Sequence, residues 1–151
     1  HTITRSFERF LPQAKTLNML PSYLYYREAM RANAHDTLLI DRDGRILEGT
    51  RSNFFAIKDK TLYTAPLERV LNGVTRQHVM AAAKQNGYTV TEMAVALHNI
   101  TNYDGAFLTH TSGGIVPIKS IGDFSFTEIA PALKDLMNCY DKYIEAASTK
   151  F

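Results

Sequence analysis

The chain has 151 residues, of which 45% are hydrophobic, and this is enough for one globular domain with a buried core. Its 17 basic and 15 acidic residues leave a formal charge of +2 and are spread along the sequence, so no basic patch predicts nucleic-acid binding. No apolar run approaches the roughly 20 residues of a membrane span, and no signal peptide opens the chain. We therefore expect a cytoplasmic protein without nucleic-acid or membrane partners.

The cysteine and the histidines give no sign of a disulfide or a metal site. The only cysteine, Cys139, cannot form an intramolecular disulfide, which fits a reducing compartment. The five histidines are dispersed and stand apart from clustered cysteines or carboxylates, so no metal site is expected. The sequence begins with His1 and enters a strand-like pattern at once, which we interpret as a fragment of a longer protein.

The first half of the chain alternates between strand and helix patterns. Residues 2–7 alternate as a strand, residues 12–15 form a short polar connection, and apolar residues at helical spacing predict a helix from Ser22 to Ala34. Gly44 follows Asp41-Arg42-Asp43 in a predicted hairpin turn. The strands of a predicted β-meander lie at residues 38–40, 46–48, 53–57 and 61–64.

The second half continues in the same way. An apolar face predicts a helix over residues 75–86, with Gly87 as its left-handed C-terminal residue. A long amphipathic helix is predicted over residues 127–147; Ser125 with Glu128 resembles a capping box, whereas Pro131 favours a later first turn. Three further strands are predicted at residues 88–91, 106–109 and 115–118. The fold class is therefore α+β (mixed α/β), with an antiparallel-rich sheet and flanking helices.

One of the eight lysines, Lys15, stands at the end of a strand and just before an aromatic, apolar helix. A lysine that attacks an aldehyde must be neutral, and desolvation by apolar neighbours such as Leu17, Met19, Leu20 and Tyr23 favours the neutral amine. The alternative is an ordinary surface lysine. Only the other segments can decide between these interpretations.

A carboxylate and small polar residues follow in Glu48-Gly49-Thr50-Arg51-Ser52-Asn53. A buried carboxylate facing a pyridine nitrogen would keep that nitrogen protonated, so that the ring withdraws electrons from a substrate carbanion. Glu48 is the candidate for this role. The alternative is an exposed hairpin glutamate that pairs with Arg51 at the surface.

Two glycine-containing loops are suited to a phosphate. Leu71-Asn72-Gly73-Val74-Thr75-Arg76 opens a predicted helix, whose backbone N–H groups and Thr75 hydroxyl suit a phosphate dianion. The alternative for Thr75 is an N-cap without any ligand. Thr109-His110-Thr111-Ser112-Gly113-Gly114 leaves a strand with three hydroxyls and two glycines, and its alternative is an ordinary turn.

Read in order, these segments resemble the class IV aminotransferases, the family of branched-chain aminotransferases, D-amino-acid transaminases and aminodeoxychorismate lyase. The resemblance implies the large C-terminal domain of the D-amino-acid aminotransferase-like fold, with residues 1–151 forming the domain that binds pyridoxal 5'-phosphate. It also implies a homodimer and a small N-terminal domain, with a phosphate-binding arginine, that has no counterpart in this sequence. The segments that carry the resemblance are residues 12–18, 39–55, 62–66, 71–76, 107–111 and 116–118.

The family's functional residues carry over to matching positions. Lys15 is expected to form the Schiff base and to shuttle the proton, and Glu48 to bond the pyridine nitrogen. The ring-packing and phosphate-binding residues expected from the resemblance are Leu71, Gly73, Val74, Thr75, Thr111 and Ser112. The sequence departs from many members at Leu20, Arg51 and His110, where an aromatic residue or smaller side chains are common, and His110 is expected to line the pocket.

The resemblance predicts transamination of an amino acid to its 2-oxo acid, with Lys15 removing the α-proton. A branched-chain L-amino acid is the first expected substrate, because that activity is common in the family. A D-amino-acid transaminase and an aminodeoxychorismate lyase are the alternatives within the family. A catalytically inactive binding domain of the same fold is the alternative from a different functional class.

Overall fold

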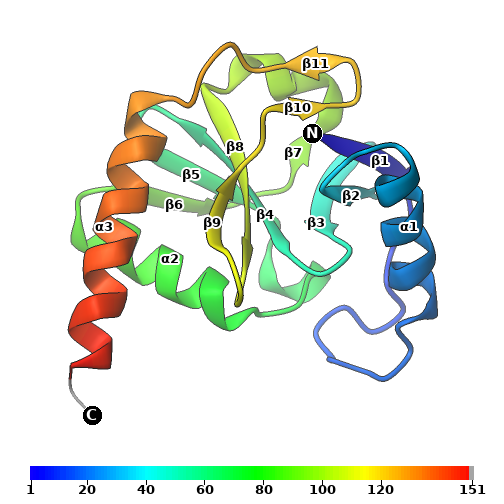
Figure 1. The fold of residues 1–151 in the computed structure, drawn as a ribbon, viewed down its shortest axis with the longest axis horizontal. Helices are drawn as coiled ribbons and strands as arrows, with labels where there is room; N and C mark the ends of the chain where they lie inside the picture. Colours follow the sequence, from blue (N-terminus) through cyan, green and yellow to red (C-terminus); the bar gives the residue numbers. More distant parts are fainter. Residues whose placement is uncertain (150–151) are drawn as a thin grey trace.

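A computed structural model describes residues 1–149, in which eleven strands form one mixed sheet flanked by three α-helices (Figure 1). Within these residues no helix combines the length and the apolar character that crossing a bilayer requires. The α-helices are α1 (Leu20–Arg31), α2 (Val74–Gln85) and α3 (Pro131–Ser148), and the short 3-10 helices are η1 (Leu67–Arg69) and η2 (Leu97–Asn102). The strands are β1 (Thr2–Ser6), β2 (Asp36–Ile40), β3 (Arg45–Gly49), β4 (Asn53–Lys58), β5 (Thr61–Thr64), β6 (Thr89–Glu92), β7 (Val95–Ala96), β8 (Gly105–His110), β9 (Gly114–Pro117), β10 (Ser120–Ile121) and β11 (Phe124–Ser125).

The strand pairing of the sheet changes between β3 and β4. Strands β2, β3, β4 and β5 follow one another as antiparallel neighbours, which confirms the predicted meander. However, β3 and β4 pair through a single residue pair, Glu48 opposite Asn53, because β4 pairs along its length with β5 and β8 instead. The strands therefore diverge beyond Glu48. The polar segments around Glu48, Leu71 and Thr109 meet near this point.

Strand β4 links the two main parts of the core. Its side chains alternate, so that Phe54 and Ala56 pack with β2, β3 and β8 on one side, while Phe55 and Ile57 pack toward α2 and α3 on the other. The Phe55 and Phe107 rings stack with centroids 5.0 Å apart. Figure 1 shows α2 and α3 together at one side of the sheet and α1 beside β1 and β2 at the other. This packing fixes the positions of β4 and β8 next to the point where β3 and β4 diverge.

The predicted boundaries agree with the structure where the local signal is strong. Gly44 and Gly87 have φ angles of 74° and 78°, which confirms both as left-handed turn residues. Helix α3 begins at Pro131, so the capping box at Ser125 was the wrong interpretation, because a fixed φ makes proline suitable for a first turn. Helix α1 begins at Leu20, earlier than predicted, because Pro21 occupies its first turn. The two-residue strands β7, β10 and β11 are too short to show a period.

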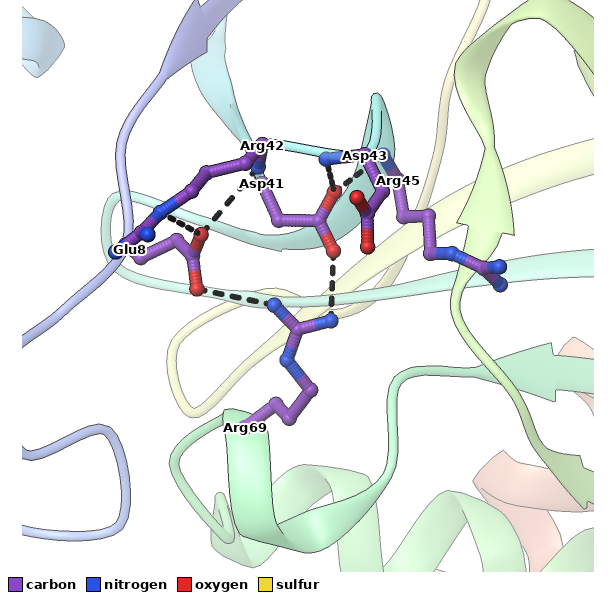
Figure 2. A network of polar contacts seen from close by, with 6 residues as sticks. All are labelled: Glu8, Asp41, Arg42, Asp43, Arg45 and Arg69. Carbon is purple, nitrogen blue, oxygen red and sulfur yellow. Dashed lines mark hydrogen bonds and ion pairs between the residues drawn. The ribbon is translucent and has the colours of Figure 1, made fainter.

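A network of ion pairs fastens the chain after β1 to the β2–β3 hairpin and to η1 (Figure 2). The buried Asp41 carboxylate accepts hydrogen bonds from the backbone N–H groups of Asp43 and Arg45, and it pairs with Arg69 at 2.6 Å. Arg69 also pairs with Glu8 at 3.0 Å. Burial by itself raises the pKa of Asp41, but these hydrogen bonds and the Arg69 charge lower it overall. The ionised network holds Glu8, and with it the start of the segment that leads to Lys15.

Replacing Arg69 tests this network. Arg69→Met is expected to lower the free energy of unfolding at pH 7 by about 1 to 3 kcal/mol, because it leaves the buried Asp41 carboxylate without its cation. Since the folded-state pKa of Asp41 lies below its ordinary value of 3.8, the network's contribution is present above pH 3.8 and is lost as pH falls through the lower value. Urea denaturation at pH 7 and at pH 3 measures both effects.

Arg42→Met is the control, because the Arg42 side chain is 94% exposed and its distance to Glu8 is 3.6 Å. Its effect should stay within about 0.5 kcal/mol. Equal losses for Arg42→Met and Arg69→Met would contradict the role given to the buried ion pair.

Candidate active site

A cavity of about 500 Å³ lies where β3 and β4 diverge. It is lined by the end of β3, the β3–β4 turn, the loop before α2, the end of β8 and the segment that contains Lys15. These segments are far apart in the sequence, so the fold, and not local spacing, brings them together. Of the predicted site residues, the cavity is lined by Lys15, Glu48, Leu71, Gly73, Val74, Thr75, His110 and Thr111.

Glu48 is the buried carboxylate of the cavity, with the residue only 5% exposed. Its Oε1 lies 3.4 Å from Nε of Arg9, and its Oε2 accepts a hydrogen bond from the backbone N–H of Leu71 at 3.3 Å. Burial raises the pKa of Glu48 to about 7, although the charge of Arg9 and the Leu71 N–H oppose the increase. This environment rules out the exposed-hairpin interpretation, and the ion partner is Arg9 where Arg51 had been considered. A second cationic donor placed in the cavity would stabilise the ionised form.

The loop before α2 presents a helix N-terminus to the same cavity. Gly73 is the N-cap, and no side chain within residues 1–149 caps the helix, so the first backbone N–H groups of Val74 and Thr75 lack a side-chain acceptor there. The alternative interpretation of Thr75 as the N-cap is therefore wrong, since the helix begins at Val74, one residue before it. Val74 is 60% exposed and Thr75 is buried. An anion is the ligand that such a terminus favours.

Asn53 fixes the position of this loop. Its Nδ2 donates to the backbone carbonyl of Leu71 at 2.8 Å. A Cβ atom at Gly73 would collide with Oδ1 of Asn53, so a side chain at position 73 cannot fit without moving the loop. The absence of a side chain at Gly73 therefore lets the strand β4 and the start of α2 approach closely beneath the cavity.

Asp36 organises the β3–β4 turn from below. Its carboxylate is buried and accepts hydrogen bonds from the Thr50 hydroxyl and backbone N–H and from the Ser52 hydroxyl, at 2.5, 3.1 and 2.8 Å. A Cβ at Gly49 would collide with the carboxylate of Asp36 and the hydroxyl of Ser52. The turn is thus held rigidly against β2, and this sets where Arg51 projects.

The end of β8 forms the remaining wall. The Thr109 hydroxyl and Nε2 of His110 are buried and have no hydrogen-bond partner within residues 1–149. Thr111 lines the cavity and is exposed, whereas Ser112 does not line it and instead lies 3.2 Å from Nδ1 of His110. A polar ligand in the cavity is the natural partner for the buried Thr109 hydroxyl. The structure thus brings Thr111 to the site but leaves Ser112 beside it.

Lys15 reaches the cavity from a segment that lies on the surface. The residue lines the cavity together with Met19, yet Lys15 is exposed, and so are its apolar neighbours. Leu17 is fully exposed and Leu20 is 63% exposed. The expectation that Leu17, Met19, Leu20 and Tyr23 desolvate Lys15 was wrong within residues 1–149, because all four are at least 43% exposed. Any exclusion of water from the Lys15 amine requires a cover from outside residues 1–149.

Three residues that sequence reasoning missed shape this site. Arg9 pairs with Glu48, Asp36 holds the turn, and Asn53 holds the loop before α2. Asn53 was quoted only as the end of a segment, although an amide at the start of a buried strand needs a partner. No sequence signal pairs Arg9 with Glu48, because the contact depends on how the segment after β1 folds back over β3.

Sequence and structure comparisons place this site in a known family. The family described as amino-transferase class IV matches residues 1–121. The chain belongs to the class IV aminotransferase family. This confirms the resemblance on which the candidate residues rest, and it places Lys15, Glu48 and the start of α2 inside the matched region.

Relatives of this class IV chain have different names. The chain is 36% identical over 118 residues to D-alanine aminotransferase of Bacillus licheniformis, covering 78% of this chain and 41% of that protein. It is 43% identical over 95 residues to a probable branched-chain-amino-acid aminotransferase of Rickettsia felis, covering 63% and 33% respectively. A crystal structure of a putative 4-amino-4-deoxychorismate lyase from Legionella pneumophila superposes with a TM-score of 0.86 at 26% identity, covering 94% of this chain and 55% of that one. The chain thus spans between a third and about half of these proteins.

Glu48→Gln tests the electrostatics of this class IV site in the cofactor-free protein. The folded-state pKa of about 7 lies above the ordinary value of 4.5, so the unfolded chain ionises first and wild-type stability is lost as pH rises from 4.5 to 7. The neutral amide avoids this loss, and we expect the variant to be more stable than wild type by about 2 to 3 kcal/mol at pH 8 but not at pH 4. Urea denaturation at both pH values measures the difference.

Glu128→Gln is the matched control, because Glu128 is exposed and lies far along the sequence from the cavity residues. Its stability should follow that of wild type at both pH values. If Glu48→Gln also follows wild type, the carboxyl is not desolvated as described.

Proposed function

We propose that this chain forms the pyridoxal-phosphate site of an enzyme that transfers an amino group between an amino acid and a 2-oxo acid. The observation that carries the proposal is the single cavity lined by a lysine, a buried carboxylate and an uncapped helix N-terminus, from Lys15, Glu48 and the Val74–Thr75 start of α2. Each supplies one requirement of a ligand that has an aldehyde, a pyridine ring and a phosphate. Family membership supports the same conclusion.

The residues of the cavity fit this cofactor. The raised pKa of Glu48 shows a carboxylate that is short of positive partners, and a pyridine N–H would supply one. The uncapped start of α2, the Thr111 segment and the unpartnered Thr109 hydroxyl offer donors to a phosphate at a different wall. When bound, the cofactor supplies an electron sink for the pair left behind when a substrate α-carbon loses its proton.

The chain's own residues have separable tasks in this mechanism. The Nζ atom of Lys15 would hold the cofactor covalently, and as a neutral amine it would take up and return the proton of the substrate α-carbon. Glu48 would keep a proton on the ring nitrogen of the bound cofactor, and Arg9 orients the Glu48 carboxylate. Leu71 donates its N–H to Glu48 while its side chain lines the cavity. These tasks need Lys15 to be neutral and shielded from water.

A second copy of this protein, together with a small N-terminal domain, is our proposal for that shield. Seven of the exposed large apolar side chains fall between residues 10 and 24, next to Lys15. Such a dense exposed apolar segment is typical of an interface. The side chains are Phe10, Leu11, Leu17, Met19, Leu20, Tyr23 and Leu24. A homodimer that covers this segment would exclude water from the cavity mouth.

Three substrates are candidates for this site. A branched-chain L-amino acid is our first candidate, because several relatives are named branched-chain-amino-acid aminotransferases. A D-amino acid is the alternative supported by the D-alanine aminotransferase relative, and elimination of pyruvate from aminodeoxychorismate is supported by the lyase of the same fold. Single-turnover assays with L-leucine, D-alanine and aminodeoxychorismate distinguish them. The first two give 4-methyl-2-oxopentanoate and pyruvate and leave their amino group on the protein, whereas the last gives pyruvate together with 4-aminobenzoate and leaves no amino group behind.

Covalent trapping tests the cofactor assignment. The complete protein should turn yellow with pyridoxal phosphate, and borohydride should fix the cofactor on the peptide that contains Lys15, as detected by mass spectrometry. Lys15→Ala should lose this adduct and lower the turnover rate by about 10³-fold or more, because the lysine is both the attachment point and the base.

Lys84→Ala is the control for this experiment, since Lys84 is an exposed lysine of α2 that does not line the cavity. It should keep the adduct and the activity. A colourless protein that gives no adduct at Lys15 would instead support a catalytically inactive binding domain.

A further inference from the structure

Arg51 places an unpaired positive charge in the cavity. It belongs to the rigid turn between β3 and β4, lines the cavity and is exposed. Its guanidinium carbon lies 3.9 Å from the centroid of the Tyr26 ring. Within residues 1–149, no protein acceptor forms a hydrogen bond or ion pair with this guanidinium. The positive charge is therefore held in place without being neutralised.

The carboxylates near this turn are already engaged. Asp36 accepts hydrogen bonds from Thr50 and Ser52 on either side of Arg51, and Glu48 pairs with Arg9. Stacking on Tyr26 uses one flat face of the guanidinium and leaves the N–H groups at its edge available. Those N–H groups are suited to a planar or tetrahedral oxyanion, which they can bind through two parallel hydrogen bonds.

The end of β8 faces the same charge. Burial lowers the pKa of His110, and the electrostatic influence of His35 and Arg51 lowers it further, while Asp36 opposes the shift. The lowered pKa favours the neutral imidazole beside Arg51. Its Nε2 and the Thr109 hydroxyl are the buried polar atoms of this wall that have no partner within residues 1–149. The Arg51 cation and the unpartnered Nε2 of His110 thus come from two neighbouring elements of the cavity, whereas the side chain of Thr109, the preceding residue of β8, points to the opposite face of the sheet.

We propose that Arg51 binds an oxyanion group at the β8 end of the cavity, with the Tyr26 ring holding its guanidinium in position. The group is a carboxylate of the substrate or the phosphate of the cofactor, which share the same recognition chemistry. This inference rests on the proposed function, because both groups belong to that reaction. Arg51 is then a specificity-determining residue, and the Glu48–Arg51 surface pair considered from the sequence is replaced by a ligand contact.

Binding measurements on the cofactor-free protein test this inference with three probes. Pyridoxal phosphate and pyridoxal differ only in the phosphate, and succinate offers carboxylates alone. Arg51→Gln should weaken binding of pyridoxal phosphate or of succinate by about tenfold to a hundredfold in titration calorimetry, and it should leave pyridoxal unchanged. Tyr26→Leu should weaken the same probe by a smaller factor, because it only releases the guanidinium.

The matched control comes from the same helix. The guanidinium of Arg27 lies 5.7 Å from the Tyr23 ring, and neither residue lines the cavity. Arg27→Gln should bind all three probes as wild type does.

The probe whose binding is lost identifies the ligand of Arg51. A loss specific to pyridoxal phosphate identifies the phosphate as the partner of Arg51, and a loss specific to succinate identifies a carboxylate. An Arg51→Gln variant that matches Arg27→Gln, or that loses pyridoxal as strongly as pyridoxal phosphate, overturns the inference. Failure of the proposed function is seen separately, as the absence of a borohydride-stable adduct at Lys15 in the wild-type protein.

Discussion

The site depends on the burial of one carboxylate, Glu48, at the residue pair that joins β3 to β4. Beyond this pair the strands diverge, because β4 pairs with β8, and a cavity opens beside the carboxylate. Arg9 and the Leu71 N–H satisfy Glu48 only in part, so its pKa is raised to about 7. Keeping an under-compensated carboxylate in the core costs stability, which a cationic ligand would recover.

Contacts between the elements around this point hold the other groups of the site in position. Asp36 holds the turn after Glu48 from β2, and Asn53 holds the loop before α2 from β4. The Asp41–Arg69–Glu8 network holds the start of the segment that carries Arg9 and Lys15 (Figure 2). The walls of the cavity are thus rigid on the side of the sheet, while the side of Lys15 is exposed and apolar. Such a division is consistent with a site completed by another part of the protein.

The sequence was sufficient to predict the order of the main elements and the segments around Glu48, Leu71 and Thr109. Alternation and helical spacing are local properties, and glycine turns at Gly44 and Gly87 are recognisable from a few residues. Contacts across the fold were not accessible in this way. The Arg9–Glu48 pair and the cation–π contact between Arg51 and Tyr26 each join residues that only the tertiary structure brings together. The burial of Lys15 was predicted from its sequence neighbours, and those neighbours face outward.

A crystal structure of the complete protein grown with pyridoxal phosphate tests the central claim most directly. We expect continuous density from Nζ of Lys15 to the cofactor, the ring nitrogen within hydrogen-bond distance of the Glu48 carboxylate, and the phosphate at the backbone N–H groups of Val74 and Thr75. A cofactor bound elsewhere, or a Glu48 carboxylate with no contact to the ring nitrogen, would contradict it.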